Sequence, residues 1–338
     1  NLLKDYYNNF MEHLAFSVIK ILGVSAFASF VAILWSPFLI NFLYKKQLWK
    51  KEVRKKTISG EDAVIFSQLH RERETKVPRF GGLLVVLTTI FIAFLFFIVS
   101  IIFPNSLLAK FNFLSRPQTW LPLFTLAVAS LLGFFDDILV VSSLGKYIGG
   151  GLSFKKRLLI VILLGLVGGS WFYWKLGWDI ITIPLLGHFS IGIFYIPLFI
   201  LVMVACWSGG IIDGIDGLSG GVFASIFGAF TIISFSQGKI DLATFCAVIT
   251  GTLFSFLWFN IPPARFYMSE VGILGLTTTL SVVAFLTDSV FVLPIIAGLL
   301  VVEVGSVILQ LLSKKFRHKK IFLSTPIHHH FEAIGWPA

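Results

Sequence analysis

Residues 81–103 read GGLLVVLTTIFIAFLFFIVSIIF and contain no charged side chain. A helix needs about 20 mainly apolar residues to cross the hydrocarbon core of a bilayer, so this stretch predicts a membrane-spanning helix. Comparable apolar runs recur along the whole chain. We expect nine spans, at about residues 15–43, 81–103, 119–137, 158–174, 189–210, 218–236, 242–259, 271–287 and 289–313.

The composition agrees with that pattern. Of the 338 residues, 57% are hydrophobic and 13% are charged, and the mean hydropathy is +0.90. These values lie far from those of soluble globular proteins and predict an all-α polytopic membrane protein. We expect a single domain, 1–338, because no internal repeat, linker or soluble module is visible. Cys206 and Cys246 both lie in apolar spans, which favours buried thiols over a disulfide or a zinc site.

The positive charges predict an orientation. In a nine-span bundle the segments 45–80, 138–157, 211–217, 260–270 and 314–338 share one side, and they hold 21 of the 27 Lys and Arg residues. The positive-inside rule makes this side cytoplasmic and puts the N-terminus outside. Segment 45–80 is then the longest cytoplasmic loop, with a candidate amphipathic helix around 61–70, and 314–338 is a cytoplasmic tail that contains histidines. The net charge of +10 therefore requires no nucleic-acid partner, although it also suits anionic lipid or a phosphorylated substrate.

Four short polar motifs interrupt the apolar runs, and all four fall on the predicted cytoplasmic side. Ionisable groups at membrane depth are costly, and a chain that keeps several usually uses them for catalysis or transport. Their common side predicts a membrane-embedded active site. The motifs are Asp136-Asp137, Asp213-Gly-Ile-Asp216-Gly, Ser269-Glu270 and His328-His329-His330.

Asp136 and Asp137 end the third expected span. Adjacent helical residues point about 100° apart, so the two carboxylates can serve different partners, such as a metal ion and a substrate hydroxyl. The alternative is a pair of carboxylates that simply face water. The C-terminus of a helix disfavours anions, however, so an Asp pair there favours a compensating cation.

Asp213 and Asp216 lie three residues apart in a glycine-rich segment before the sixth expected span. In a helix they would share a face, and in a loop the glycines would let the backbone approach a ligand closely. The start of the following helix also offers free N–H groups to an anion. The alternative is a glycine-rich connector in which an Asp caps the helix.

The last two motifs leave more room for alternatives. Glu270 is a candidate oxygen ligand for Mg²⁺ and Arg265 a candidate phosphate contact, although the loop 260–270 could be an ordinary connector. His328, His329 and His330 could bind a transition metal or donate hydrogen bonds to phosphate. An expression tag is excluded, because the three histidines lie within the sequence TPIHHHFE.

The motifs together resemble a known family. The residues that carry the likeness occur in compatible order: Asp136-Asp137, GLS at 151–153 followed by Lys155, DGIDGL at 213–218, LWFN at 257–260 and TPIHHHFE at 325–332. The chain resembles the polyprenyl-phosphate N-acetylhexosamine-1-phosphate transferases. Within them it is most similar to the phospho-N-acetylmuramoyl-pentapeptide transferases, and the likeness covers roughly residues 30–338.

The resemblance implies a multi-pass enzyme of the bacterial inner (cytoplasmic) membrane whose active site faces the cytoplasm. Members of that family have ten spans. Such an enzyme passes phospho-MurNAc-pentapeptide from UDP-MurNAc-pentapeptide to undecaprenyl phosphate, giving lipid I and UMP in peptidoglycan synthesis. The implied cofactor is Mg²⁺, with Mn²⁺ as an alternative. The implied partners are the two substrates and membrane lipid, and a homodimer is left open.

The resemblance also implies roles for particular residues. The implied catalytic residues are Asp136, Asp137, Glu270, His328 and His329. The metal ligands would be Asp136, Asp137 and Glu270. The substrate-binding residues would be Lys76, Lys155, Asp213, Gly214, Ile215, Asp216, Asn260, Arg265 and His330.

The chain departs from the family pattern at several of these places. Glu270 stands where the family has its metal-binding Asp, Gly210 where it has Asn, and Val140 where it has Lys. Residues 77–82 read VPRFGG, a form nearer the N-acetylglucosamine-1-phosphate branch. Two alternatives therefore stay open: a related transferase that moves another UDP-amino sugar, and a non-catalytic membrane homologue.

Overall fold

The computed structural model describes residues 2–51, 75–142 and 151–336. The candidate amphipathic helix at 61–70 lies outside these residues. Within the described part, eight helical segments are long and apolar enough to cross a membrane. The chain is therefore an all-α polytopic membrane protein, as the sequence predicts. These segments contain the helices α1 (Leu2–Lys45), α3 (Gly82–Ile102), α4 (Trp120–Val141), α5 (Phe154–Ser170), α6 (Tyr195–Ser208), α7 (Leu218–Ser236), α8 (Ile240–Asn260) and α9 (Ser269–Leu286). Adjoining helical turns lengthen the segments of α5 and α6 to Phe154–Lys175 and Gly192–Ile212.

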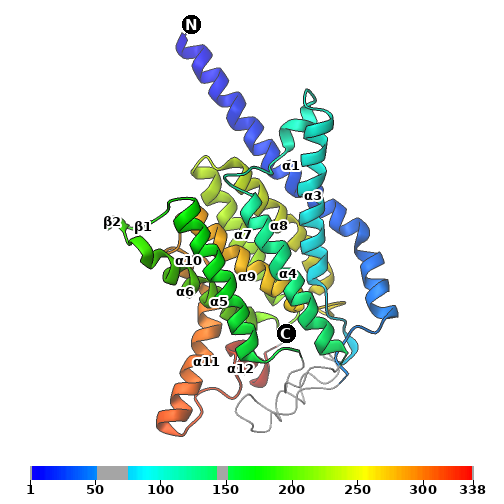
Figure 1. The fold of residues 1–338 in the computed structure, drawn as a ribbon. Coiled ribbons are helices and arrows are strands. Elements are labelled where there is room, and N and C mark those ends of the chain that lie inside the picture. The colour runs from blue at the N-terminus through cyan, green and yellow to red at the C-terminus, as the bar shows by residue number, and fades with distance from the viewer. Residues whose placement is uncertain (1, 52–74, 143–150, 337–338) are drawn as a thin grey trace.

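Shorter elements connect and follow these helices (Figure 1). A two-stranded antiparallel hairpin, β1 (Ile180–Ile183) with β2 (Gly187–Ser190), projects from the bundle between α5 and α6. Three more helices complete the chain: α10 (Leu293–Ile296), α11 (Gly298–Arg317) and α12 (Ile327–Ala333). Single turns of other helix types occur at Leu107–Phe111, Trp171–Lys175, Gly192–Phe194 and Gly209–Ile212.

Helix α9 forms the centre of the bundle, because nearly all of its side chains are buried. Its N-terminal end packs against α4 at Gly133, where a Cβ atom would lie only 2.2 Å from the carbonyl oxygen of Glu270. Glycine at this position therefore lets the two helix backbones touch. This close crossing brings the Asp pair at the end of α4 beside the start of α9. Cys206 and Cys246 are both buried and unpaired, as expected.

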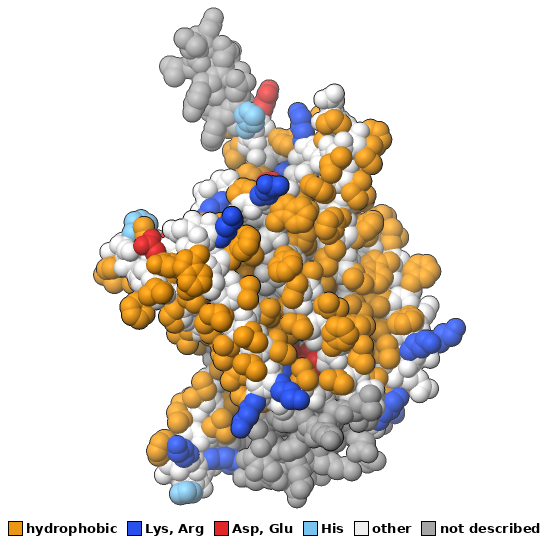
Figure 2. Space-filling view, viewed as in Figure 1, with side chains coloured by type: hydrophobic (Ala, Val, Ile, Leu, Met, Phe, Trp, Pro, Cys, Tyr) orange, Lys and Arg blue, Asp and Glu red, His pale blue; other side chains and the backbone are white. Residues whose placement is uncertain are grey.

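The outer surface of the bundle is apolar. Large side chains such as Phe38, Phe124 and Ile232 are 75%, 61% and 70% exposed. Figure 2 shows hydrophobic side chains over the middle of the molecule, with Lys and Arg side chains towards its two ends. Such a surface is stable where hydrocarbon replaces water, and it fits a chain that crosses a membrane.

The ninth expected span, 289–313, is not one continuous helix. The helix stops at Ile296 and restarts at Gly298, with Ala297 (φ −96°, ψ 29°) between the two segments. Pro294 in the first turn of α10 lacks a backbone N–H and suits a helix start better than a helix interior. An apolar run does not reveal such a break, so the sequence alone predicted one span where the structure has α10 and α11.

Helix α11 carries its polar residues on the protein-facing side. Glu303, Ser306, Gln310 and Ser313 are buried, whereas apolar neighbours such as Leu309 are exposed. Three of the buried residues hold the C-terminal segment: Oε1 of Gln310 accepts backbone N–H groups of Ile321 and Phe322, Oγ of Ser313 donates to the carbonyl of Lys319, and Glu303 pairs with His328. The polar stripe of α11 therefore anchors the tail.

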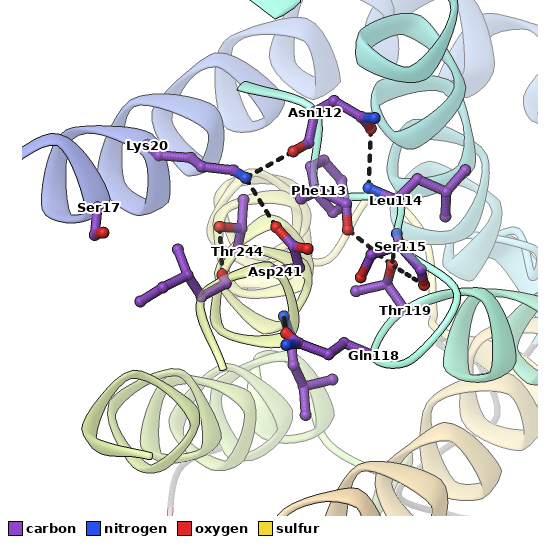
Figure 3. Close-up of polar contacts among 12 residues, drawn as sticks. Ser17, Lys20, Asn112, Phe113, Leu114, Ser115, Gln118, Thr119, Asp241 and Thr244 are labelled. Carbon is purple, nitrogen blue, oxygen red and sulfur yellow. Dashed lines mark hydrogen bonds and ion pairs between the residues drawn. The ribbon is translucent and has the colours of Figure 1, made fainter. Parts of the chain in front are cut away.

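A second polar cluster closes the other end of the bundle (Figure 3). Lys20 of α1 is 7% exposed, and its ammonium group pairs with Asp241 at 2.8 Å and donates to the carbonyl of Asn112 at 2.6 Å. The hydroxyl of Thr119 donates to the carbonyl of Phe113 in the same region. These bonds tie α1, the start of α8 and the segment before α4 together, and they satisfy a buried cation within the first span.

Candidate active site

The polar motifs of four distant segments meet at one end of the bundle, and Ser269 links two of them. The hydroxyl of Ser269 donates to Oδ2 of Asp137 at 2.7 Å, and its backbone N–H donates to Oδ2 of Asp213 at 2.7 Å. Ser269 adopts a positive φ of 56° at the start of α9, which turns its N–H and hydroxyl groups towards these two carboxylates.

Asp137 is fully buried, and both of its carboxylate oxygens are occupied. Oδ1 accepts a hydrogen bond from Nε of Arg79 at 2.9 Å, and Nη2 of Arg79 lies 2.9 Å from the same oxygen in an ion pair. Oδ2 accepts from the Ser269 hydroxyl and from the backbone N–H of Val271, the latter at 2.9 Å. Burial alone lowers the pKa of Arg79, but the carboxylates of Asp137, Glu270 and Asp213 outweigh it and raise that pKa above its usual value. Arg79 is therefore the cation that compensates Asp137 at the C-terminal end of α4.

Asp136 faces a different partner, as expected for adjacent helical residues. Its Oδ1 accepts the backbone N–H of Leu152 at 2.5 Å, and its Oδ2 lies 2.6 Å from Nη2 of Arg157. The other terminal nitrogen of Arg157 lies 2.5 Å from Oε1 of Glu270. Arg157, in the first turn of α5, thus bridges Asp136 and Glu270.

Asp213 and Asp216 lie in a loop and hold it in shape. Asp213 accepts from the Ser219 hydroxyl at 2.9 Å as well as from Ser269. Asp216 accepts the backbone N–H of Ala264 at 2.9 Å and the phenol of Tyr267 at 3.2 Å. Burial raises the pKa of Asp213, and the hydrogen bonds from Ser269 and Ser219 oppose that rise. Both carboxylates join the segment 213–217 to the segment 264–269.

Asn260 belongs to the same connection. Its side chain is fully buried, its Oδ1 accepts the backbone N–H of Gly217 at 3.0 Å, and its Nδ2 donates to the carbonyl of Phe266 at 2.9 Å. We expected this amide to face a nucleotide. In the structure both ends of the amide bind backbone groups, so Asn260 sets the spacing of the two loops.

The histidine motif docks against the loop 213–217 from the C-terminal side. A Cβ atom on Gly214 would lie 2.5 Å from Nε2 of His328 and 3.0 Å from Nε2 of His329, so glycine is required for this approach. Nδ1 of His328 pairs with Oε2 of Glu303 at 2.9 Å, and Nδ1 of His329 pairs with Glu332 at 2.8 Å. Nε2 of His328 is buried and has no hydrogen-bond partner among the described residues.

The other expected substrate-binding residues lie further out. Lys76, Lys155 and Arg265 are exposed, and the guanidinium of Arg265 lies 5.8 Å from the ring centre of Phe259. Lys155 was expected to be a cation near the diphosphate, but Arg157, two residues later, is the one that reaches the carboxylates. Ile215 is half-buried in the loop, and Nδ1 of His330 accepts the backbone N–H of Leu323 at 3.3 Å.

The described carboxylates, in this arrangement, do not form a ready metal site. Among the residues that the structure describes, no three His, Cys, Asp or Glu side chains are grouped to hold a metal ion. Hard divalent cations prefer carboxylate oxygens, and Asp136, Asp137 and Glu270 supply that chemistry. However, Asp137 accepts three hydrogen bonds and is paired with Arg79, and the guanidinium of Arg157 lies between Asp136 and Glu270.

Three residues at this site were missed as site residues from the sequence. Arg79 and Arg157 lie among other Lys and Arg residues in loops rich in positive charge, which hides their contacts. Glu303 was the better signal, because an acidic residue inside an expected membrane span usually needs a functional or paired partner. That partner is His328.

Comparison with known proteins shows the family of the chain. The family described as glycosyl transferase family 4 matches residues 119–288. A phospho-N-acetylmuramoyl-pentapeptide-transferase of Lacticaseibacillus paracasei is 34% identical over 317 residues, which cover 93% of this chain and 89% of the relative. The proteins of the same name from Bacillus subtilis and Latilactobacillus sakei are 32% identical over 90% of this chain and 39% identical over 64% of it, covering 87% and 67% of the relatives. The chain therefore belongs to the phospho-N-acetylmuramoyl-pentapeptide transferase family.

Proposed function

We propose that this protein transfers phospho-MurNAc-pentapeptide from UDP-MurNAc-pentapeptide to undecaprenyl phosphate. An oxygen of the lipid phosphate attacks the phosphorus that bears the sugar. The bond from that phosphorus to the oxygen of the uridine-bearing phosphate breaks, so UMP leaves and lipid I forms. The names of the relatives supply the transferred group.

This proposal is supported mainly by one observation: the four motifs lie together at one end of the bundle. Asp137 and Asp213 share Ser269 as a donor, Glu270 follows it in the chain, and His328 lies against the loop that Asp213 begins. These groups come from α4, α9, α12 and the loop before α7. Such convergence in a chain of this family favours catalysis over the non-catalytic alternative.

The charges suit a reaction between two phosphates. Two anions must approach each other, so catalysis depends on cationic and N–H donors that neutralise phosphoryl oxygens. Arg157 supplies N–H donors at the site, and Nε2 of His328, which has no hydrogen-bond partner among the described residues, can donate when it carries a proton. Ser269, Asn260 and Asp216 hold the loops around them in a fixed geometry, and this limits reorganisation during the reaction.

The orientation is also a proposal. The excess of Lys and Arg at the end that carries these motifs favours a cytoplasmic site in the bacterial inner membrane. A cytoplasmic site would receive the soluble UDP-sugar from water, and the lipid substrate would arrive from the bilayer.

Mg²⁺, or Mn²⁺ in its place, remains the proposed cofactor. When bound it would neutralise phosphate oxygens. Asp136 and Glu270 would be its ligands, because Asp137 is occupied by Arg79, Ser269 and Val271, and Arg157 would first have to leave the position between them.

A related UDP-amino sugar is the second candidate donor. The segment VPRFGG at residues 77–82 favours it, and in the structure this segment pairs with the loop before α9 through Gly81 and Gly82. Purified protein should be incubated with undecaprenyl phosphate and labelled UDP-MurNAc-pentapeptide, UDP-GlcNAc or UDP-GalNAc in turn. Labelled lipid from the first donor alone supports the proposal. Product from another donor alone selects the second candidate, and no product from any donor supports a non-catalytic homologue.

A further inference from the structure

We propose that Arg157 occupies the cation position of this site and competes with a divalent metal ion for Asp136 and Glu270. Its terminal nitrogens lie 2.6 Å from Oδ2 of Asp136 and 2.5 Å from Oε1 of Glu270. The inference rests on the proposed function only in treating these carboxylates as the place where a divalent cation binds.

The neighbouring carboxylate cannot take part in this exchange. Asp137 is 0% exposed, and its two oxygens already accept three hydrogen bonds, one each from Arg79, Ser269 and Val271, beside a second ion-pair contact with Arg79. Displacing these donors would break an entire connection between α4 and α9. Among the described carboxylates at this site, Asp136 and Glu270 therefore remain as the pair that a mobile cation can bridge.

The bond between Arg157 and Asp136 is incomplete. Oδ2 of Asp136 is buried and accepts no well-directed hydrogen bond from the described residues, although the guanidinium lies close to it. Nε of Arg157 is buried and also lacks a partner. A buried polar atom without a hydrogen bond is costly, so the contact between Arg157 and Asp136 is stabilised mainly by the attraction of opposite charges and less by hydrogen bonding. A cation with better access to both carboxylates can replace it.

The guanidinium lies at the surface end of the site. A small surface pocket of about 10 Å³, room for about one water molecule, is lined by Asp136, Arg157 and Glu270 together with Trp207. The side chain of Arg157 is 24% exposed and that of Glu270 is 21% exposed, so both reach the rim of this pocket. Arg157 can therefore turn towards an incoming phosphate, for which its planar donor fork is well suited.

The length of the Glu270 side chain allows its carboxylate to reach Arg157. The backbone of Glu270 packs closely against α4 at Gly133, where an added Cβ atom would lie 2.2 Å from the Glu270 carbonyl oxygen. From that fixed backbone the carboxylate reaches Nη1 of Arg157. An Asp at this position is one methylene shorter and would release one end of the guanidinium.

The test is direct metal binding to the purified full-length protein without substrate. Mn²⁺ titration, followed by electron paramagnetic resonance, compares the parent with Arg157→Gln. We expect Arg157→Gln to bind Mn²⁺ at least about tenfold more tightly, because one hydrogen bond between charged groups is worth that much or more in a binding constant. Lys156→Gln is the matched control. It removes the same charge from an exposed neighbour on α5, and its affinity should change by less than about threefold.

Arg157→Lys covers the case in which the Gln variant does not fold. It keeps one positive charge but lacks the fork that touches both carboxylates, so its Mn²⁺ affinity should lie between those of the parent and the Gln variant. Equal affinity in the parent and all Arg157 variants would overturn the proposal, as would equal tightening by Lys156→Gln. These outcomes do not depend on turnover, so failure of the transfer assay leaves the metal result interpretable.

Discussion

Glu303 and His328 form a buried pair: Oε2 of Glu303 lies 2.9 Å from Nδ1 of His328, and their side chains are 8% and 5% exposed. This contact directs Nε2 of His328 towards Gly214. A carboxylate on one imidazole nitrogen fixes the orientation and the tautomer of the ring. We infer that Glu303 positions His328 for the phosphates of the substrate.

Glu303→Gln tests this role. Gln keeps the size and one oxygen acceptor but removes the charge, so the ring of His328 should remain in place but be oriented less firmly. We expect turnover to fall between about tenfold and a hundredfold, as for other partners of functional histidines, with little change in thermal unfolding. Glu12→Gln, on an exposed part of α1, is the control. Turnover within twofold of the parent would show that Glu303 is merely structural.

Glu270 is the position at which this chain departs most sharply from its family. Glu270→Gln removes the charge that holds Arg157, and turnover should fall at least about 10²-fold, comparable to the loss of one preorganised electrostatic group. Glu270→Asp keeps the charge but shortens the reach. If Arg157 competes with the metal, the Asp variant should need less Mg²⁺ for half-maximal activity, which a metal titration of the initial rate measures. An unchanged requirement would argue against a bridge that depends on Glu.

The metal requirement itself can be measured on the parent protein. The candidate ligands are carboxylate oxygens, and Cys206 and Cys246 are buried in the bundle, so a hard cation is expected. Activity should vanish with EDTA and return with excess Mg²⁺ or Mn²⁺. Full activity in EDTA would remove the metal from the reaction, and recovery with Zn²⁺ alone would change its identity.

The orientation can be tested at two exposed positions. Leu185 lies at the turn of the β1–β2 hairpin, and Lys319 follows α11. In intact cells, a membrane-impermeant thiol reagent should label Leu185→Cys but not Lys319→Cys. The native cysteines are buried and should give little background. Labelling of Lys319→Cys from outside would reverse the proposed orientation.

Hydropathy predicted the spans well because each helix that crosses the lipid needs about 20 mainly apolar residues. Residues 81–103 and 242–259 correspond closely to Gly82–Ile102 and Ile240–Asn260. The break between α10 and α11 escaped because both pieces are apolar on their exposed sides. The role of the buried polar residues Glu303, Gln310 and Ser313 became clear only from their contacts with the tail.

The motifs predicted several residues of the site but not the residues that bind them. The need for a cation beside Asp136 and Asp137 followed from their place at a helix C-terminus. Which cations these are depends on long-range packing, which joins Arg79 and Arg157 to α4 across 58 and 21 residues of chain. The partners of Asn260 escaped for the same reason, since they lie in loops that the sequence does not place side by side.

Formation of lipid I tests the proposed reaction most directly. The purified protein in lipid vesicles, with undecaprenyl phosphate and UDP-MurNAc-pentapeptide, should yield equal amounts of UMP and of the undecaprenyl diphosphate-linked sugar, both measured by mass spectrometry. The inactive control is Asp136→Asn, which removes one carboxylate beside Arg157. Equal yields in the parent, with at least about 10²-fold less in the control, are the predicted result. UMP without the lipid-linked product, or neither product at any Mg²⁺ concentration, would contradict the proposed transfer.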